Sequence, residues 1–313
     1  MQRQSCPYVV GIGHCCRDTI CTVEAYPPED GSTHILSMDD SQGGGAVATA
    51  LVAAARLGMR AEVIANLGTD ATGDAIAAEF SAEGVGTEGI RRVEGGRSSV
   101  SYVMVDSEKG TRTKFPYRDN LPPIVFDAQR RRLIEGASAL HLDGTQYENA
   151  LNAVHIAKQA GVPVSLDGCS MQKDNEKNLA LAAMADILIM NARYPLRVSG
   201  EADVEKALRA MASLGGAKVV ITTRGGEGCW ALIDGSLRHF PAFAVKAVDT
   251  TGAGDVFHGA FLTAWLEGRG IEDSIRFASA VSALKCTRYG GRAGIPAREA
   301  AEAFLAAQSK GVS

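Results

Sequence analysis

Short apolar segments alternate with segments of helical period along most of this chain. YVVGIGH (8–14) and AEVIANLG (61–68) are β-branched and apolar, which is typical of buried strands. Helical patterns follow them in GGGAVATALVAAARLG (43–58) and TGDAIAAEFSAEGV (72–85). Further strands are predicted in 138–144, 162–168, 185–191 and 217–225. This alternation predicts an α/β fold of three layers (α/β/α), with a mostly parallel central sheet that helices cover on both faces.

Two stretches break this rhythm. RDTICTVEAYPPEDGSTHILSM (17–38) and RSSVSYVMVDSEKGTRTKFPYR (97–118) are turn-rich or alternate polar with apolar residues. We expect β-hairpins that together form a small β-sheet, a lid at one edge of the α/β domain. The predicted division is an α/β/α body of residues 1–13, 39–94 and 121–313, and a lid of residues 14–38 and 95–120.

Composition excludes several classes of protein. A formal net charge of −4 and a pI near 5.9 argue against a nucleic-acid binder or a membrane-surface protein. The opening MQRQSCPYVVGIG has too short an apolar run for a signal peptide, and the longest apolar stretch, AVATALVAAA, is too short to span a bilayer. Seven cysteines, without a CxxC pair, indicate free thiols in a reducing compartment. We therefore expect a cytoplasmic protein.

The segment DTTGAGDVFHGAF (249–261) places Gly252, Ala253 and Gly254 directly before Asp255. Apolar residues then recur at helical spacing, so a helix begins at this turn. The first turn of a helix presents unpaired N–H groups and a positive dipole end, and glycine lets an anion approach them. A carboxylate beside that anion can accept a proton from an attacking hydroxyl. These features suit phosphoryl transfer, although a plain helix cap remains an alternative for this segment alone.

This segment closely resembles the C-terminal signature of the PfkB (ribokinase-like) carbohydrate kinases. Residues 43–74 resemble the N-terminal signature of the same family, and the resemblance covers nearly the whole chain in the family's order. Residues 277–296 look most like the fructokinase and sulfofructose kinase-like branches. The resemblance implies a ribokinase-like fold with a β lid. It also implies ATP and Mg²⁺ as nucleotide and cofactor, and transfer of the γ-phosphate to a hydroxyl of a sugar.

The resemblance also implies roles for individual residues. Asp255 would be the catalytic base, and the Gly252, Ala253 and Gly254 turn would form the anion hole for the transferred phosphate. The residues that would bind the sugar substrate are Asp18, the glycine pair Gly44 and Gly45, and Thr49. Lys114 and Arg118, both basic and in the lid, would meet an anionic substituent of the sugar or would simply be solvated.

On the nucleotide side, TTRGGEG (222–228) resembles the strand-to-loop segment that lines the nucleotide in the family. The nucleotide-binding residues that this implies are Asn191, Thr223, Gly225 and Gly228. Asp249 and Thr251 match positions near a monovalent cation, K⁺ in particular. KCTRYGGRAG (285–294) is the segment that would supply the remaining carbonyl ligands of that cation.

Three features depart from the family's pattern or exclude another route. Thr49 stands where many members have an asparagine that contacts the substrate. The family's NxxE motif reads Asn191-Ala192-Arg193-Tyr194, so a tyrosine replaces the glutamate that helps to organise magnesium. Mg²⁺ could then be held mainly by nucleotide phosphates and water. No Walker A sequence is present, which excludes a P-loop kinase.

Other polar residues have plainer interpretations. Arg130, Arg131 and Arg132 are predicted to be solvated at the exposed start of a helix. The six histidines lack the spacing of a metal hydrolase. His258 shares a helix face with Asp255, and packing or a hydrogen bond behind the site is its expected role.

Two alternatives to a sugar kinase remain. One is a kinase of nucleosides or vitamin-like alcohols with the same fold. The other is a non-catalytic sugar-binding protein, and the altered NxxE motif is the only feature that favours it. The expected partners are the sugar and ATP, with no nucleic acid and no membrane. Lid strands with exposed edges also predict a homodimer formed through the lid.

Overall fold

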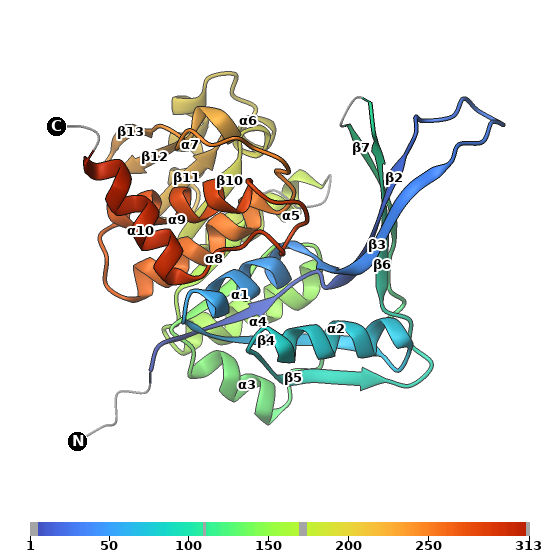
Figure 1. The fold of residues 1–313 in the computed structure, drawn as a ribbon. Helices are drawn as coiled ribbons and strands as arrows, with labels where there is room; N and C mark the ends of the chain where they lie inside the picture. The colour runs from blue at the N-terminus through green and yellow to red at the C-terminus, as the bar shows by residue number, and fades with distance from the viewer. Residues whose placement is uncertain (1–5, 109–110, 169–173, 311–313) are drawn as a thin grey trace.

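The computed structural model describes residues 6–108, 111–168 and 174–310. Its predicted strands assemble into a nine-stranded sheet of order β13-β12-β11-β10-β9-β8-β1-β4-β5 (Figure 1). The strands are β1 (Tyr8–Ile12), β4 (Arg60–Gly68), β5 (Val85–Val93), β8 (Ala139–Leu142), β9 (Val164–Asp167), β10 (Ile187–Asn191), β11 (Val219–Thr223), β12 (Cys229–Ile233) and β13 (Ser236–Phe240). All neighbours pair in parallel except β12 and β13, which extend one edge as antiparallel strands.

Helices cover both faces of this sheet. One hydrophobic core lies under α1 (Ala46–Arg56), α2 (Ala71–Ala82), α8 (Ala253–Leu266), α9 (Ile271–Lys285) and α10 (Arg298–Lys310). The second core lies under α3 (Ala128–Glu135), α4 (Tyr147–Gln159), α5 (Asn175–Met184), α6 (Arg193–Ser199) and α7 (Val204–Ser213). The central strands are buried from both sides, which explains their continuous apolar runs. The predicted three-layer arrangement is confirmed. Among the described residues, no helix is long and apolar enough to cross a membrane.

The two irregular stretches form a separate four-stranded sheet, as predicted. Its order is β3-β2-β6-β7, from β2 (Cys16–Val23), β3 (Ile35–Gly44), β6 (Ser99–Asp106) and β7 (Arg112–Tyr117). The pairs β2/β3 and β6/β7 are antiparallel, and β2 pairs with β6 in parallel. Figure 1 shows this sheet projecting from the α/β body as an arm. Strand β3 continues to Gly44, past the predicted lid boundary at residue 38, so the lid runs directly into the glycine pair.

The carboxyl ends of the parallel strands converge below this lid sheet. Functional residues in α/β folds lie at that edge, because loops of neighbouring strands meet there. Asp143 follows β8 directly. The last residues of β9, β10 and β11 are Asp167, Asn191 and Thr223. The fold therefore brings together segments that the sequence keeps far apart.

Candidate active site

The glycine turn at residues 252–254 forms the start of helix α8. Gly252 has a φ of 74°, and a Cβ atom there would stand 2.8 Å from the carbonyl oxygen of Gly291. A side chain at this position would be strained in both respects. Gly254 has open space where its Cβ would stand, so a ligand can approach the backbone. The turn thus has the form of the predicted anion hole, at the positive end of a 14-residue helix.

Asp255 lies on the first turn of α8, beside the open backbone. The pKa of Asp255 is raised from 3.8 to about 6, chiefly by desolvation and next by the nearby carboxylate of Asp167, with a smaller contribution from Asp143. His258 and Lys114 act in the opposite direction. A carboxylate with a pKa near neutrality is well suited to accept a proton at physiological pH.

His258 lies next to the buried carboxyl group of Asp167, which in turn lies near Asp255. Its Nε2 lies 3.5 Å from Asp167 Oδ1, and both side chains are buried. The His258 ring packs against that of His141, with centroids 5.2 Å apart. Burial lowers the pKa of His141 to about 3, so that imidazole is neutral. The packing role predicted for His258 agrees with these contacts.

The predicted sugar-binding residues come together under the lid. Asp18 on β2 lies against Gly44, where an added Cβ would be 2.5 Å from the Asp18 carboxylate. Gly45 has a φ of 99°, and its Cβ would overlap the carbonyl oxygen of His14. The backbone path between β3 and α1 therefore requires glycine at Gly45, and a side chain at Gly44 would displace the Asp18 carboxylate. Cys16 Sγ donates to Asp18 Oδ1 at 3.3 Å and packs under this turn.

Arg292 holds the glycine pair in place, and sequence reasoning did not single it out. It is 4% exposed, and its Nη2 donates to the carbonyl oxygen of Gly44 at 3.0 Å. Its Nη1 forms an ion pair with Glu79 at 2.8 Å, and Glu79 in turn accepts the Gly43 N–H at 3.1 Å. No sequence signal marks this role, because the partners come from three distant segments.

Thr49 takes part in the same network. Its side chain is buried in α1, and Oγ1 accepts a hydrogen bond from Arg292 Nε at 3.3 Å. The predicted contact of Thr49 with substrate stays a prediction. The contact that the structure gives its hydroxyl is with Arg292.

A cavity of about 460 Å³ opens on the other side of the α8 turn. Thr223, Gly225 and Gly228, which are predicted to bind the nucleotide, line it together with apolar side chains such as Phe243. Ala253 and Gly254 also line this cavity. The cavity therefore leads directly to the predicted anion hole.

Asn191, which is exposed, and Tyr194, which is buried, are not among the residues that line this cavity. Asn191 Oδ1 accepts the backbone N–H groups of Arg193 and Tyr194 at 3.1 and 3.0 Å, which secures the start of α6. Tyr194 is 2% exposed, and burial raises the pKa of its hydroxyl. In the described residues, no cluster of three or more His, Cys, Asp or Glu side chains could hold a metal ion.

Asp249 and Thr251, the residues predicted to lie near a monovalent cation, already have donors. Asp249 Oδ1 accepts the Thr251 N–H at 2.8 Å, and Oδ2 accepts the Gly290 N–H at 2.9 Å. The Asp249 carbonyl oxygen accepts Lys285 Nζ at 2.9 Å, and Thr251 Oγ1 accepts a hydrogen bond from Arg112. Desolvation by itself would raise the pKa of Asp249. The hydrogen bonds from the backbone N–H groups outweigh it and hold the pKa below its ordinary value. A free cation would compete here with two basic side chains.

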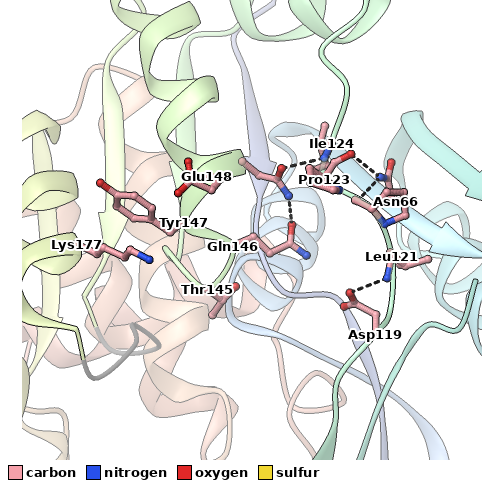
Figure 2. A pocket seen from close by; sticks show the side chains of 12 residues that line it. Asn66, Asp119, Leu121, Pro123, Ile124, Thr145, Gln146, Tyr147, Glu148 and Lys177 are labelled. Atoms are coloured by element: carbon pink, nitrogen blue, oxygen red, sulfur yellow. Dashed lines mark hydrogen bonds between the residues drawn. The ribbon is translucent and has the colours of Figure 1, made fainter.

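A second cavity, of about 290 Å³, is lined mainly by the segment 119–124 and by the start of α4 (Figure 2). Thr145 and Gln146 line it, next to Asp143, to which Thr145 Oγ1 donates at 2.6 Å. The other walls carry the amides of Asn66 and Asn149. The remaining lining residues are Asp119, Leu121, Pro122, Pro123, Ile124, Tyr147, Glu148 and Lys177. This cavity therefore offers both polar groups and free volume.

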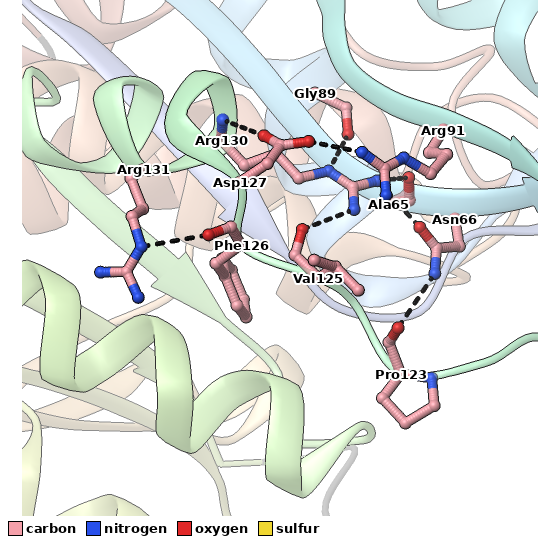
Figure 3. Close-up of polar contacts among 10 residues, drawn as sticks. All are labelled: Ala65, Asn66, Gly89, Arg91, Pro123, Val125, Phe126, Asp127, Arg130 and Arg131. Carbon is pink, nitrogen blue, oxygen red and sulfur yellow. Dashed lines mark hydrogen bonds and ion pairs between the residues drawn. The ribbon is translucent and has the colours of Figure 1, made fainter.

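Arg130 braces one wall of this cavity, and the prediction that it is solvated is wrong. Its side chain is 3% exposed, and Nη2 donates to the carbonyl oxygen of Ala65 and to Asn66 Oδ1 at 2.9 and 2.8 Å (Figure 3). Asn66 Nδ2 in turn donates to the carbonyl oxygens of Pro122 and Pro123. Backbone carbonyls within β4 and β5 and in the segment before α3 supply acceptors for the buried guanidinium, which a run of three arginines in sequence does not reveal. Arg131 and Arg132 are exposed as expected.

Lys114 and Arg118 lie at the lid side of the site and are exposed. Lys114, on β7, is close enough to Asp255 for its charge to lower the pKa of that carboxyl. Arg112, two residues earlier on β7, reaches Thr251 beside the anion turn. The lid therefore places the basic side chains of Lys114 and Arg112 near Asp255 and the anion turn. The sequence analysis did not single out Arg112.

Comparison with known proteins supports the family resemblance. The family model described as pfkB family carbohydrate kinase matches residues 7–298. An ATP-dependent ribose-1-phosphate kinase from Halopiger xanaduensis is 33% identical over 95% of this chain and 97% of its own length. A ribokinase from Haemophilus influenzae is 30% identical over 84% of this chain and 87% of its own. The structure of an Arabidopsis thaliana ribokinase with ribose and ATP is 26% identical with a TM-score of 0.85, covering 96% of this chain and 99% of that one. The chain therefore belongs to the PfkB family of carbohydrate kinases.

Proposed function

We propose that this protein transfers the γ-phosphate of ATP to a hydroxyl, a primary alcohol, of a sugar or sugar derivative, with Asp255 as the general base. One observation carries the proposal. The open first turn of α8 lines the cavity that Thr223, Gly225 and Gly228 share, and it bears a carboxylate with a raised pKa. A base and an anion hole between two binding sites are what phosphoryl transfer requires.

The chemistry follows from this arrangement. The acceptor hydroxyl gives its proton to Asp255, and its oxygen attacks the γ-phosphorus in line as the bond to the leaving ADP oxygen breaks. The backbone of Gly252, Ala253 and Gly254 stabilises the charge that builds up on the transferred phosphoryl group. Mg²⁺, held mainly by the nucleotide phosphates, would neutralise part of that charge. The lid excludes water, which would otherwise accept the phosphate.

The cavity beside Thr145 bears on the acceptor. Asp18 and the glycine pair would hold the sugar, and the cavity would receive the part of the acceptor remote from the reacting hydroxyl. A free pentose would leave this space to solvent, whereas a substituted pentose, a hexose or a nucleoside would fill more of it. The relative from Halopiger xanaduensis is named for ribose 1-phosphate, and one from Methanothermobacter thermautotrophicus, 29% identical, is named a nucleoside kinase.

The test is ADP release by the purified protein with Mg-ATP across ribose, ribose 1-phosphate, ketoses, acidic sugars and nucleosides. A sugar or sugar phosphate that gives the highest kcat/KM supports the proposal and identifies the acceptor class. A nucleoside that outperforms every sugar would replace it with the nucleoside-kinase alternative. ATP binding without turnover of any acceptor would favour the non-catalytic alternative.

A homodimer through the lid belongs to the same proposal. Large apolar side chains on the lid strands are exposed, namely Ile35, Leu36, Met38, Tyr102, Phe115 and Tyr117. A second copy would cover them and the open strand edges. Light scattering during gel filtration should give twice the chain mass, and Met38→Lys with Phe115→Lys should give a monomer. Leu214→Lys, an exposed apolar position away from the lid, is the control. A monomeric wild type would refute the dimer. A cytoplasmic location stays a prediction from the unpaired cysteines.

A further inference from the structure

Lys285, at the C-terminal end of α9, has an unusual setting. Its side chain is 0% exposed, although a lysine ammonium is strongly hydrated and is rarely buried without partners. Nζ points at the loop before the anion turn and donates to the carbonyl oxygen of Asp249 at 2.9 Å. Burial lowers the pKa of the Lys285 ammonium, and the nearby Asp249 carboxylate acts in the opposite direction and favours its charged form. The fold therefore buries a positive charge next to the segment that leads into the anion hole.

The side-chain oxygens of Asp249 and Thr251 accept hydrogen bonds from groups that the fold holds in place. The Asp249 carboxylate is held by the backbone N–H groups of Thr251 and Gly290, one on each oxygen. From the lid, the Arg112 guanidinium donates to Thr251 Oγ1. The segment 249–251 thus meets two basic side chains, one from α9 and one from the lid. A cation bound among these oxygens would be repelled by both charges.

We propose that the Lys285 ammonium, assisted by Arg112, supplies the fixed positive charge that a monovalent cation would otherwise supply to this loop, so that the enzyme needs no such cation. The inference rests on the proposed function of the α8 turn. Lys285 is a positioning residue, because it acts through Asp249 and the turn at 252–254 rather than on substrate. Its charge is covalently tethered, so holding the loop in its active form requires no ion from solution.

The test compares K⁺ with tetramethylammonium at constant ionic strength, in two readouts. Acceptor-dependent ADP formation by wild type should be the same in both salts. Thermal unfolding of the wild-type protein without substrates should also show no K⁺-specific rise in Tm, because a protein without a K⁺ site gains nothing from K⁺ binding. The second readout does not depend on catalysis, so it separates failure of this inference from failure of the proposed function.

Lys285→Met removes the charge and keeps a long apolar side chain. Its activity should fall by about tenfold or more in tetramethylammonium, and K⁺ or NH₄⁺ should restore part of that loss. Lys206→Met, at an exposed position on α7, is the matched control and should behave as wild type in both salts. If Lys285→Met does not fold, the two wild-type measurements still decide the question.

Several results would overturn the inference. Activation of the wild type by K⁺, or a K⁺-specific increase in its Tm, would mean that a cation binds despite Lys285. A folded Lys285→Met that keeps full activity without K⁺ would mean that the charge is not needed. A folded variant whose lost activity no monovalent cation restores would mean that Lys285 only fills space.

Discussion

The carboxyl of Asp255 makes the folded protein less stable than it would be with a neutral group at that position. Its pKa rises from 3.8 to about 6 on folding, chiefly through desolvation. A folded-state pKa above the unfolded one means that the ionised form is disfavoured in the folded protein. The cost is therefore present above about pH 6 and disappears as the pH falls below the unfolded pKa.

Asp255→Asn removes this cost with little change in shape. The full pKa shift corresponds to about 3 kcal/mol at 1.36 kcal/mol per unit. Because the side chain is only half-buried, solvent screening reduces the expected gain to about 1 to 3 kcal/mol. For a chain of this size the variant should unfold about 2 to 6 °C higher than wild type at pH 8. At pH 3.5 and below, the difference should vanish, because wild-type Asp255 is then protonated in both states.

The assay is thermal unfolding without ligands, from pH 8 down to the acid limit of folding. Asp273→Asn is a matched control, since Asp273 is also the third residue of its helix, α9, and is exposed. It should change Tm little, in either direction, at any pH. If Asp255→Asn matched or fell below wild type at pH 8, Asp255 would not be a desolvated carboxylate, and its assignment as a tuned base would lose its physical basis.

Three further predictions follow from the same site. The kcat/KM of wild type should fall tenfold per pH unit below about pH 6, where Asp255 becomes protonated; a flat profile from pH 7 to 5 would argue against a base with a raised pKa. Gly252→Ala should lower both activity and stability, the latter by roughly 1 to 3 kcal/mol, because it adds a Cβ against Gly291. Gly268→Ala, with a φ of 86° and open space, is its control and should cost stability alone. Arg292→Lys should raise the KM for the acceptor more than that for ATP, because lysine lacks the planar guanidinium that contacts both the Gly44 carbonyl oxygen and Glu79. Equal changes in both KM values would contradict this role.

The sequence predicts much of the layer arrangement, because strands and helices differ in apolar period and each period is local. The strands β1, β4 and β8 to β11 all fall inside the predicted ranges or within one residue of them. The antiparallel edge formed by β12 and β13 was not predicted. β12 (CWALI) is apolar but only five residues long, and β13 (SLRHF) is largely polar and mostly exposed. Strand β3 extends to Gly44, six residues past the lid boundary predicted at residue 38, and the polar residues in this part of the sequence gave no sign of a strand.

The site was predictable where a motif carries it and unpredictable where tertiary contacts do. The α8 turn and Asp255 stand in one segment whose chemistry can be read residue by residue. Arg292 and Arg130 could not be interpreted in the same way. Their partners are backbone carbonyls and a glutamate that only the fold brings near, so a charged residue in sequence looks solvated whether or not it is buried.

The central claim is that Asp255 removes the proton from the acceptor hydroxyl. The most direct measurement is acceptor-dependent ADP formation by wild type and Asp255→Asn at pH 8, with ATP binding to both proteins measured by calorimetry. The account predicts equal ATP affinity and a kcat at least about 100-fold lower in the variant. A variant that binds ATP and transfers phosphate within a few-fold of the wild-type rate would contradict it.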